Sequence, residues 1–167
     1  GALHEYGLSD KGGEVREWYN GFTFGKRADI YNPWSILNFL DKGKVALYWV
    51  NTSSNRLVGR LIREGSPEVK MVMEDLLKGN AYHTTMDEQI VYDQLDRRRS
   101  AVWSLLLAGG YLRVDHFAFD ESRGKTDYDL SLTNKEVRFM FEQMIEDWFS
   151  EYTPAYNAFV KALLKGD

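Results

Sequence analysis

The chain contains three prolines, and each directly follows a residue that commonly caps the start of a helix. The pairs are Asn32-Pro33, Ser66-Pro67 and Thr153-Pro154. An Asn, Ser or Thr side chain accepts a hydrogen bond from a free amide of the first helical turn, and proline fits the next position because it has no amide hydrogen. We therefore expect a helix to begin at each pair, with the first two helices ending at Gly43 and Gly79.

Further polar caps predict three more helices. The caps lie at residues 51–54, Asp96 and Thr133, and the first two of these helices end at Gly65 and Gly109-Gly110. The first of them places Leu57, Leu61 and Ile62 on one face. Thr133 and Glu136 form a predicted capping box, in which the glutamate side chain bonds back to the cap residue.

A change of periodicity predicts a β-hairpin in the second half of the chain. Residues 111–119 and 126–132 alternate in residue type, and the polar stretch between them contains Gly124. A further short strand is expected over residues 89–95. A helix, a glycine break and a hairpin in succession are typical of the closing half of a winged helix.

The expected fold is mostly α, in the α+β class. A helical bundle subdomain over residues 1–82 precedes a winged-helix-like subdomain over residues 83–167, in which two C-terminal helices follow the hairpin. The boundary is placed in the polar stretch 79–87. With 44% hydrophobic residues, the chain has enough apolar bulk to bury a core.

Charge and composition exclude several functional classes. The net charge of -4 argues against a protein whose whole surface neutralises phosphates, and leaves room only for a local basic patch. The absence of cysteine removes disulfides and thiolate metal sites. No apolar run approaches the roughly 20 residues needed to cross a bilayer, and the N-terminus lacks a signal-peptide pattern. We expect a cytoplasmic protein without a membrane partner.

Residues 21–27 superficially resemble a phosphate-binding loop. A P-loop needs four residues between its glycines and a Ser or Thr after the lysine. Here only residues 22–24 separate Gly21 from Gly25, and Arg27 follows Lys26. A turn is therefore favoured over a phosphate cradle.

No group of side chains predicts a catalytic or metal site. His4, His83 and His116 lie far apart in sequence, whereas zinc needs three or four converging ligands. Several carboxylates share strand or helix faces: Asp127, Asp129, Glu142, Glu146 and Asp147. They lack the lysine-bearing strand of a metal-dependent nuclease and are interpreted as solvated faces. We expect no catalytic residue, metal or cofactor in this chain.

One dense basic run precedes the predicted hairpin. If the winged half binds DNA, the candidate nucleic-acid contacts are Arg97, Arg98, Arg99, Arg113, Arg123 and Lys125. The alternative is an exposed, solvated first helical turn. We favour this alternative because the chain is negative overall and cations at a helix N-terminus oppose the macrodipole.

Three strings in the first third are rich in aromatic residues and asparagine. They are Trp18-Tyr19-Asn20-Gly21-Phe22-Thr23-Phe24-Gly25, Ile30-Tyr31-Asn32-Pro33-Trp34-Ser35-Ile36-Leu37-Asn38-Phe39-Leu40 and Tyr48-Trp49-Val50-Asn51-Thr52-Ser53-Ser54-Asn55. Aromatic residues at this density more often form a core than a ring-stacking site. Together with residues 104–112 and 134–138, the strings resemble the C-terminal part of the bacterial AAA-ATPase-like family. The motif residues are Trp18, Tyr19, Asn20, Gly21, Tyr31, Asn32, Pro33 and Trp34.

In that family an N-terminal nucleoside triphosphatase domain is commonly followed by a helical and winged-helix segment, and then by a PD-(D/E)XK nuclease-like domain. The phosphate-binding loop and the nuclease motif fall outside the matching region, so the resemblance implies neither activity here. It implies a fragment of a larger protein that would bind ATP and magnesium, with the ATPase and nuclease-like domains as its intramolecular partners.

We therefore expect a non-catalytic regulatory or linker module. The alternatives are a DNA-binding winged-helix module and a protein-interaction domain built from the aromatic C-terminal helices.

Overall fold

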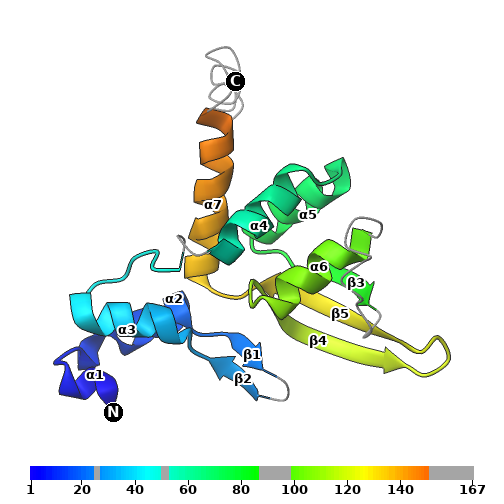
Figure 1. The fold of residues 1–167 in the computed structure, drawn as a ribbon. Coiled ribbons are helices and arrows are strands. Elements are labelled where there is room, and N and C mark those ends of the chain that lie inside the picture. Colours follow the sequence, from blue (N-terminus) through cyan, green and yellow to red (C-terminus); the bar gives the residue numbers. More distant parts are fainter. Residues whose placement is uncertain (25–26, 50–52, 87–98, 151–167) are drawn as a thin grey trace.

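The computed structural model describes residues 1–24, 27–49, 53–86 and 99–150 (Figure 1). Helices predominate and are joined by small antiparallel sheets, so the predicted mostly helical α+β class is confirmed. The expected strand at 89–95 and the last helix after Pro154 lie outside the described residues.

The N-terminal part combines short helices with a small hairpin. Its elements are α1 (Ala2–Glu5), the 3-10 turn η1 (Ser9–Lys11), α2 (Gly12–Tyr19), β1 (Phe22–Phe24), β2 (Arg27–Ile30) and α3 (Pro33–Lys42). The start of α3 is as predicted, because Asn32 Oδ1 accepts a hydrogen bond from the Ser35 amide at 3.2 Å. Gly43 ends α3 in the left-handed conformation, with φ of 67°. Buried Val15, Tyr19 and Phe39 form a small core between these elements.

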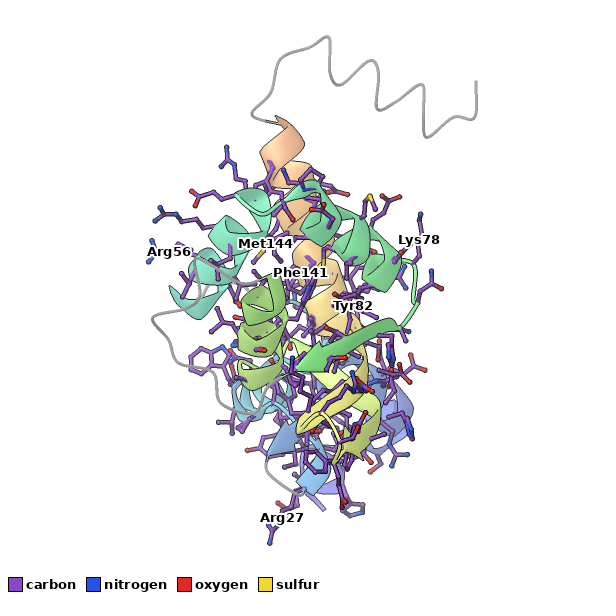
Figure 2. All side chains as sticks on the ribbon, turned by 90° about the vertical axis from the view of Figure 1, so that its right-hand side faces the viewer. Arg27, Arg56, Lys78, Tyr82, Phe141 and Met144 are labelled. Carbon is purple, nitrogen blue, oxygen red and sulfur yellow. The ribbon has the colours of Figure 1, made fainter. Side chains whose placement is uncertain are left out.

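The next two helices, α4 (Ser53–Arg63) and α5 (Pro67–Leu77), confirm the predicted helix pair. They lie beside one another and beside α7 (Figures 1 and 2). The buried face of α4 differs from the prediction. Val58 and Ile62 are buried, whereas Leu57 is 53% exposed. The burial spacing of four residues places Leu57 one position away from the inward face.

A sheet of three antiparallel strands follows, in the order β3-β5-β4. Its elements are β3 (Tyr82–Met86), α6 (Arg99–Ala108), β4 (Leu112–Asp120) and β5 (Lys125–Leu132). The predicted helix and hairpin are confirmed, and Gly110, with φ of 83°, makes the break between them. The polar sequence of β3 gave no strand signal, and it falls within the stretch interpreted as a boundary. β3 pairs with β5, the last strand of the hairpin, and the assignment of this part as a winged helix stays a prediction.

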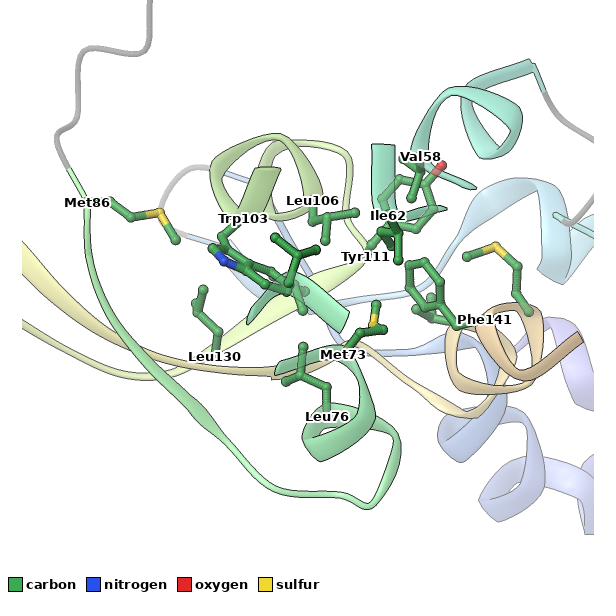
Figure 3. Close-up of a cluster of buried hydrophobic side chains, with 14 residues drawn as sticks. Val58, Ile62, Met73, Leu76, Met86, Trp103, Leu106, Tyr111, Leu130 and Phe141 are labelled. Atoms are coloured by element: carbon green, nitrogen blue, oxygen red, sulfur yellow. The ribbon is translucent and has the colours of Figure 1, made fainter. Parts of the chain in front are cut away.

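The last described helix, α7 (Lys135–Ser150), enters the main hydrophobic core with Val137, Met140 and Phe141. This core also contains Met73 of α5, Trp103 of α6 and Leu130 of β5 (Figure 3). It therefore takes residues from both sides of the predicted boundary at 82/83. The division into two subdomains stays a prediction.

Candidate functional site: a buried junction around Glu136

Glu136, in the first turn of α7, is the one buried carboxylate among the described residues, with 1% of its surface exposed. Ser35 Oγ of α3 donates a hydrogen bond to Glu136 Oε2 at 2.6 Å, and the Trp49 amide donates to Oε1 at 2.8 Å. These partners are 101 and 87 residues away in sequence. The carboxylate therefore ties the segment after α3 to the start of α7.

Burial raises the pKa of the Glu136 carboxyl above its ordinary value. Hydrogen bonds from Ser35 and from the backbone of Trp49 and Tyr48 lower the pKa, without cancelling the effect of burial. The Glu136 side chain therefore has a structural role, because both carboxylate oxygens accept hydrogen bonds from donors of the protein itself.

The start of α7 is capped by Asn134, and the predicted capping box of Thr133 and Glu136 is wrong. Asn134 Oδ1 accepts from the Val137 amide at 3.0 Å, while its Nδ2 donates to the Asn20 carbonyl at 2.9 Å. Thr133 Oγ1 instead donates to the Gly110 carbonyl at 2.6 Å. The cap residue thus also holds the N-terminal part of the chain.

The backbone at Gly21 lies close to the Thr133 carbonyl at this junction. Its φ is +103°, and a Cβ atom there would lie 2.5 Å from the Thr133 carbonyl oxygen. Both the backbone conformation and the lack of space require glycine. Gly21 is therefore a packing residue of the junction, and the described part of this string forms strand β1 (Phe22–Phe24) and, from Arg27, the start of β2.

The other predicted motif residues gather around the same junction. Trp18 stacks on Phe139 of α7 with ring centroids 5.2 Å apart. The Tyr19 carbonyl accepts from the Asn32 amide at 2.9 Å, and Trp34 Nε1 donates to the Tyr48 carbonyl at 2.9 Å.

Pro33 occupies the first position of α3, and Tyr31 packs against the small N-terminal core. The motif therefore marks structural contacts, as the core interpretation of the aromatic strings predicted.

Two residues of the third string extend the junction to Tyr111, which lies between α6 and β4. Trp49 stacks on Tyr111 with ring centroids 4.7 Å apart, and Asn55 Nδ2 donates to the Trp49 carbonyl. Tyr111 in turn donates its hydroxyl to Asn55 Oδ1 at 2.6 Å. Sequence reasoning assigned no role to Glu136 or Ser35 in this junction, and only the aromatic strings pointed towards it.

The histidines and carboxylates lie mainly on exposed surfaces. His83 Nδ1 lies 2.7 Å from Asp129 Oδ1, and Thr85 Oγ1 donates to Asp127 Oδ1 at 2.5 Å. Within the described ranges, no three His, Asp or Glu side chains are close enough together to hold a metal ion. His83 and Asp129 are thus paired across neighbouring strands.

The predicted nucleic-acid contacts are only partly described. Arg97 and Arg98 lie outside the described residues, and Arg99 begins α6.

On the hairpin, Arg113 pairs with Asp115 at 3.0 Å, and Arg123 pairs with Asp120 and Asp127 at 2.6 and 2.7 Å. Lys125 is exposed. The hairpin carries more carboxylates than cations, including Glu121 and Asp129, so its own charge does not favour phosphate binding.

Comparisons with known proteins leave the resemblance open. No family model matches the chain, and no significant match is found among curated proteins or solved structures. Membership of the AAA-ATPase-like family therefore stays a prediction. In the described part of the chain, every helix is too short or too polar to cross a bilayer.

Proposed function

We propose that the chain is a non-catalytic regulatory and linker module of a larger AAA-ATPase-like protein, which couples a nucleotide-binding domain to a C-terminal nuclease-like domain. The observation that supports this proposal most strongly is the buried junction. Glu136 joins Ser35 and Trp49 to α7, and three residues of the family motif, Trp18, Asn20 and Gly21, contact α7 or the residues just before it.

The junction provides a mechanical connection. The N-terminal part holds the first turn of α7 through Glu136, Asn134 and the stacked Trp18–Phe139 pair. The 16 residues of α7 span about 24 Å as a regular helix, so a small rotation at the first turn becomes a larger displacement at the far end. A buried, directional contact of this kind transmits motion better than a flexible linker.

In this proposal the chain itself contributes no catalytic residue and holds no cofactor. ATP and magnesium bind to the nucleotide-binding domain of the parent protein, and the parent acts in the cytoplasm. The functional residues of the module are then those of the junction, and these residues do not contact a substrate.

Calorimetric titration of the chain with magnesium and ATP tests this proposal. We expect no measurable heat of binding up to millimolar ATP, whereas the parent protein binds. Tight ATP binding by the chain alone would falsify the proposal, because the nucleotide site would then lie within the module.

A second experiment tests the coupling. In the parent protein, Ser35→Ala removes one donor to Glu136, and we expect ATP affinity to be kept while the nucleotide-dependent change in proteolysis of the C-terminal domain is reduced. Asn38→Ala on the exposed face of α3 is the control. Equal effects of the two substitutions would argue against a role of the junction in coupling.

A further inference from the structure

Helix α4 carries a row of three arginines that the junction does not use. Arg56, Arg60 and Arg63 follow the i, i+4, i+7 spacing, so they share one side of the helix over a length of about 10 Å. All three are exposed, and residues 53–63 contain no carboxylate. The row is therefore a line of positive charge longer than a single anion covers.

A groove runs between this row and the C-terminal half of α7. Its volume is about 670 Å³, within the range of about 300–1,000 Å³ that is usual for ligand sites. Met144 and Trp148 of α7 form an apolar wall, and Gly59 of α4 lies between the arginines. Figure 2 shows Arg56 at the outer edge of α4, with Met144 further inside.

Gly59 is buried and lets α4 pack closely against Met144 and Trp148 at the floor of this groove. A Cβ atom at this position would lie 3.4 Å from Met144 Sδ and 3.9 Å from Trp148 Cζ2, so any side chain longer than that of alanine would enter the groove. Glycine inside a helix lowers helix stability relative to alanine.

Two carboxylates, Glu64 and Asp147, also line the groove. Arg60 pairs with Glu64 at 3.0 Å, but both side chains are more than half exposed, and such a surface pair contributes little. Asp147 accepts a hydrogen bond from Gln143 Nε2 at 3.1 Å. Arg56 makes no ion pair within the described residues, and its position near the N-terminus of α4 opposes the helix macrodipole.

We propose that this groove binds a short segment of single-stranded nucleic acid. Successive phosphates lie along Arg56, Arg60 and Arg63, and a base stacks on the Trp148 indole. Planar guanidinium groups bind phosphate oxygens in a bidentate manner, and a positive groove with an aromatic wall is the usual arrangement for single strands. The row of evenly spaced cations matches a polymer of evenly spaced anions. An acidic peptide is the rival ligand.

This site is separate from the predicted DNA contacts on the hairpin, and it goes beyond the proposed coupling function. Arg113 and Arg123 of the hairpin are paired with carboxylates of the hairpin itself. The groove lies on α4 and α7, and its arginines project from one continuous helix.

Fluorescence anisotropy with a labelled oligo-dT of 12 nucleotides at low salt tests the proposal on the whole chain. We expect Arg56→Ala and Arg63→Ala each to weaken binding at least threefold and to reduce the slope of log affinity against log salt by about one. The matched control Lys70→Ala removes an exposed cation from α5 and should leave affinity unchanged. An abasic oligomer of equal charge should bind at least fivefold more weakly, because it lacks bases to stack.

Several outcomes would overturn this proposal. No binding at low salt would remove it, and loss of affinity in Lys125→Ala but not in Arg56→Ala would move the site to the hairpin. Equal binding of the abasic oligomer would exclude base stacking on Trp148. If poly-glutamate of matched charge displaced oligo-dT at equal concentration, the groove would be an acidic-peptide site instead.

Discussion

Replacing Glu136 tests the central structural conclusion, because this carboxylate holds three separate segments together. Glu136→Ala leaves the Trp49 amide without its acceptor and removes the partner of the Ser35 hydroxyl. An unsatisfied buried donor costs about 1–3 kcal/mol. With the cavity left by the side chain added, we expect the free energy of unfolding to fall by about 2–5 kcal/mol.

Glu136→Gln separates the hydrogen bonds from the charge. The amide oxygen can still accept from the Trp49 amide, and the amide nitrogen can donate to Ser35 Oγ. Because burial penalises the charged form of the carboxyl, we expect this variant to stay within about 1 kcal/mol of the wild type.

The pH dependence has a definite sign. Burial raises the pKa of folded Glu136 above its unfolded value, so the folded state binds the proton more tightly. The wild type should therefore gain stability relative to Glu136→Gln as pH falls from neutrality through the folded pKa to the unfolded pKa. This gain is fully present below the unfolded pKa and is lost as pH rises through the folded pKa. Taking the difference in unfolding free energy between the two proteins cancels the contribution of the other carboxylates to the pH dependence.

Urea unfolding followed by circular dichroism and tryptophan fluorescence measures these changes. Glu142→Ala is the matched control, because Glu142 lies on the same helix in an ion pair with Arg138 and should cost less than about 1 kcal/mol. A loss below about 0.5 kcal/mol in Glu136→Ala would refute the junction as a stabilising contact. A Gln variant as unstable as the Ala variant would show that the charge itself is required.

Two further substitutions probe the same junction. Gly21→Ala should lower the free energy of unfolding by about 2–4 kcal/mol, because the new Cβ meets the Thr133 carbonyl. The control Gly124→Ala, also at positive φ but in open space, should lower it by about 1 kcal/mol. Similar losses for the two variants in urea unfolding would contradict the close approach at Gly21. Asn134→Ala removes the cap of α7 and the bond to the Asn20 carbonyl, and should cost about 1–3 kcal/mol in thermal unfolding. Asn134→Asp keeps the cap alone and should fall between, and a loss as large as that of alanine would mean that the Asn20 bond dominates.

Much of the fold could be predicted because its signals are local. The Asn32-Pro33 cap fixes the start of α3, and the polar stretch with Gly124 fixes the hairpin turn. In both cases a few neighbouring residues determine the backbone conformation, since caps and turns satisfy their hydrogen bonds within a short segment. The small N-terminal helices α1 and α2 and the strand β3 had no such signal.

What the sequence could not determine were choices between competing partners. From the local sequence, Glu136 could form a capping box with Thr133. In the folded protein it instead accepts hydrogen bonds from the Trp49 amide and the Ser35 hydroxyl, because folding places these donors beside it and they require an acceptor. β3 is polar, and it becomes a strand because β5 offers a hydrogen-bonding edge.

The sequence by itself therefore determined the starts of α3 and α5, the hairpin and the mostly helical class. Only the tertiary structure decided that Ser35 and Trp49 form a junction with Glu136, because buried donors must be paired and the available acceptor lies about a hundred residues away.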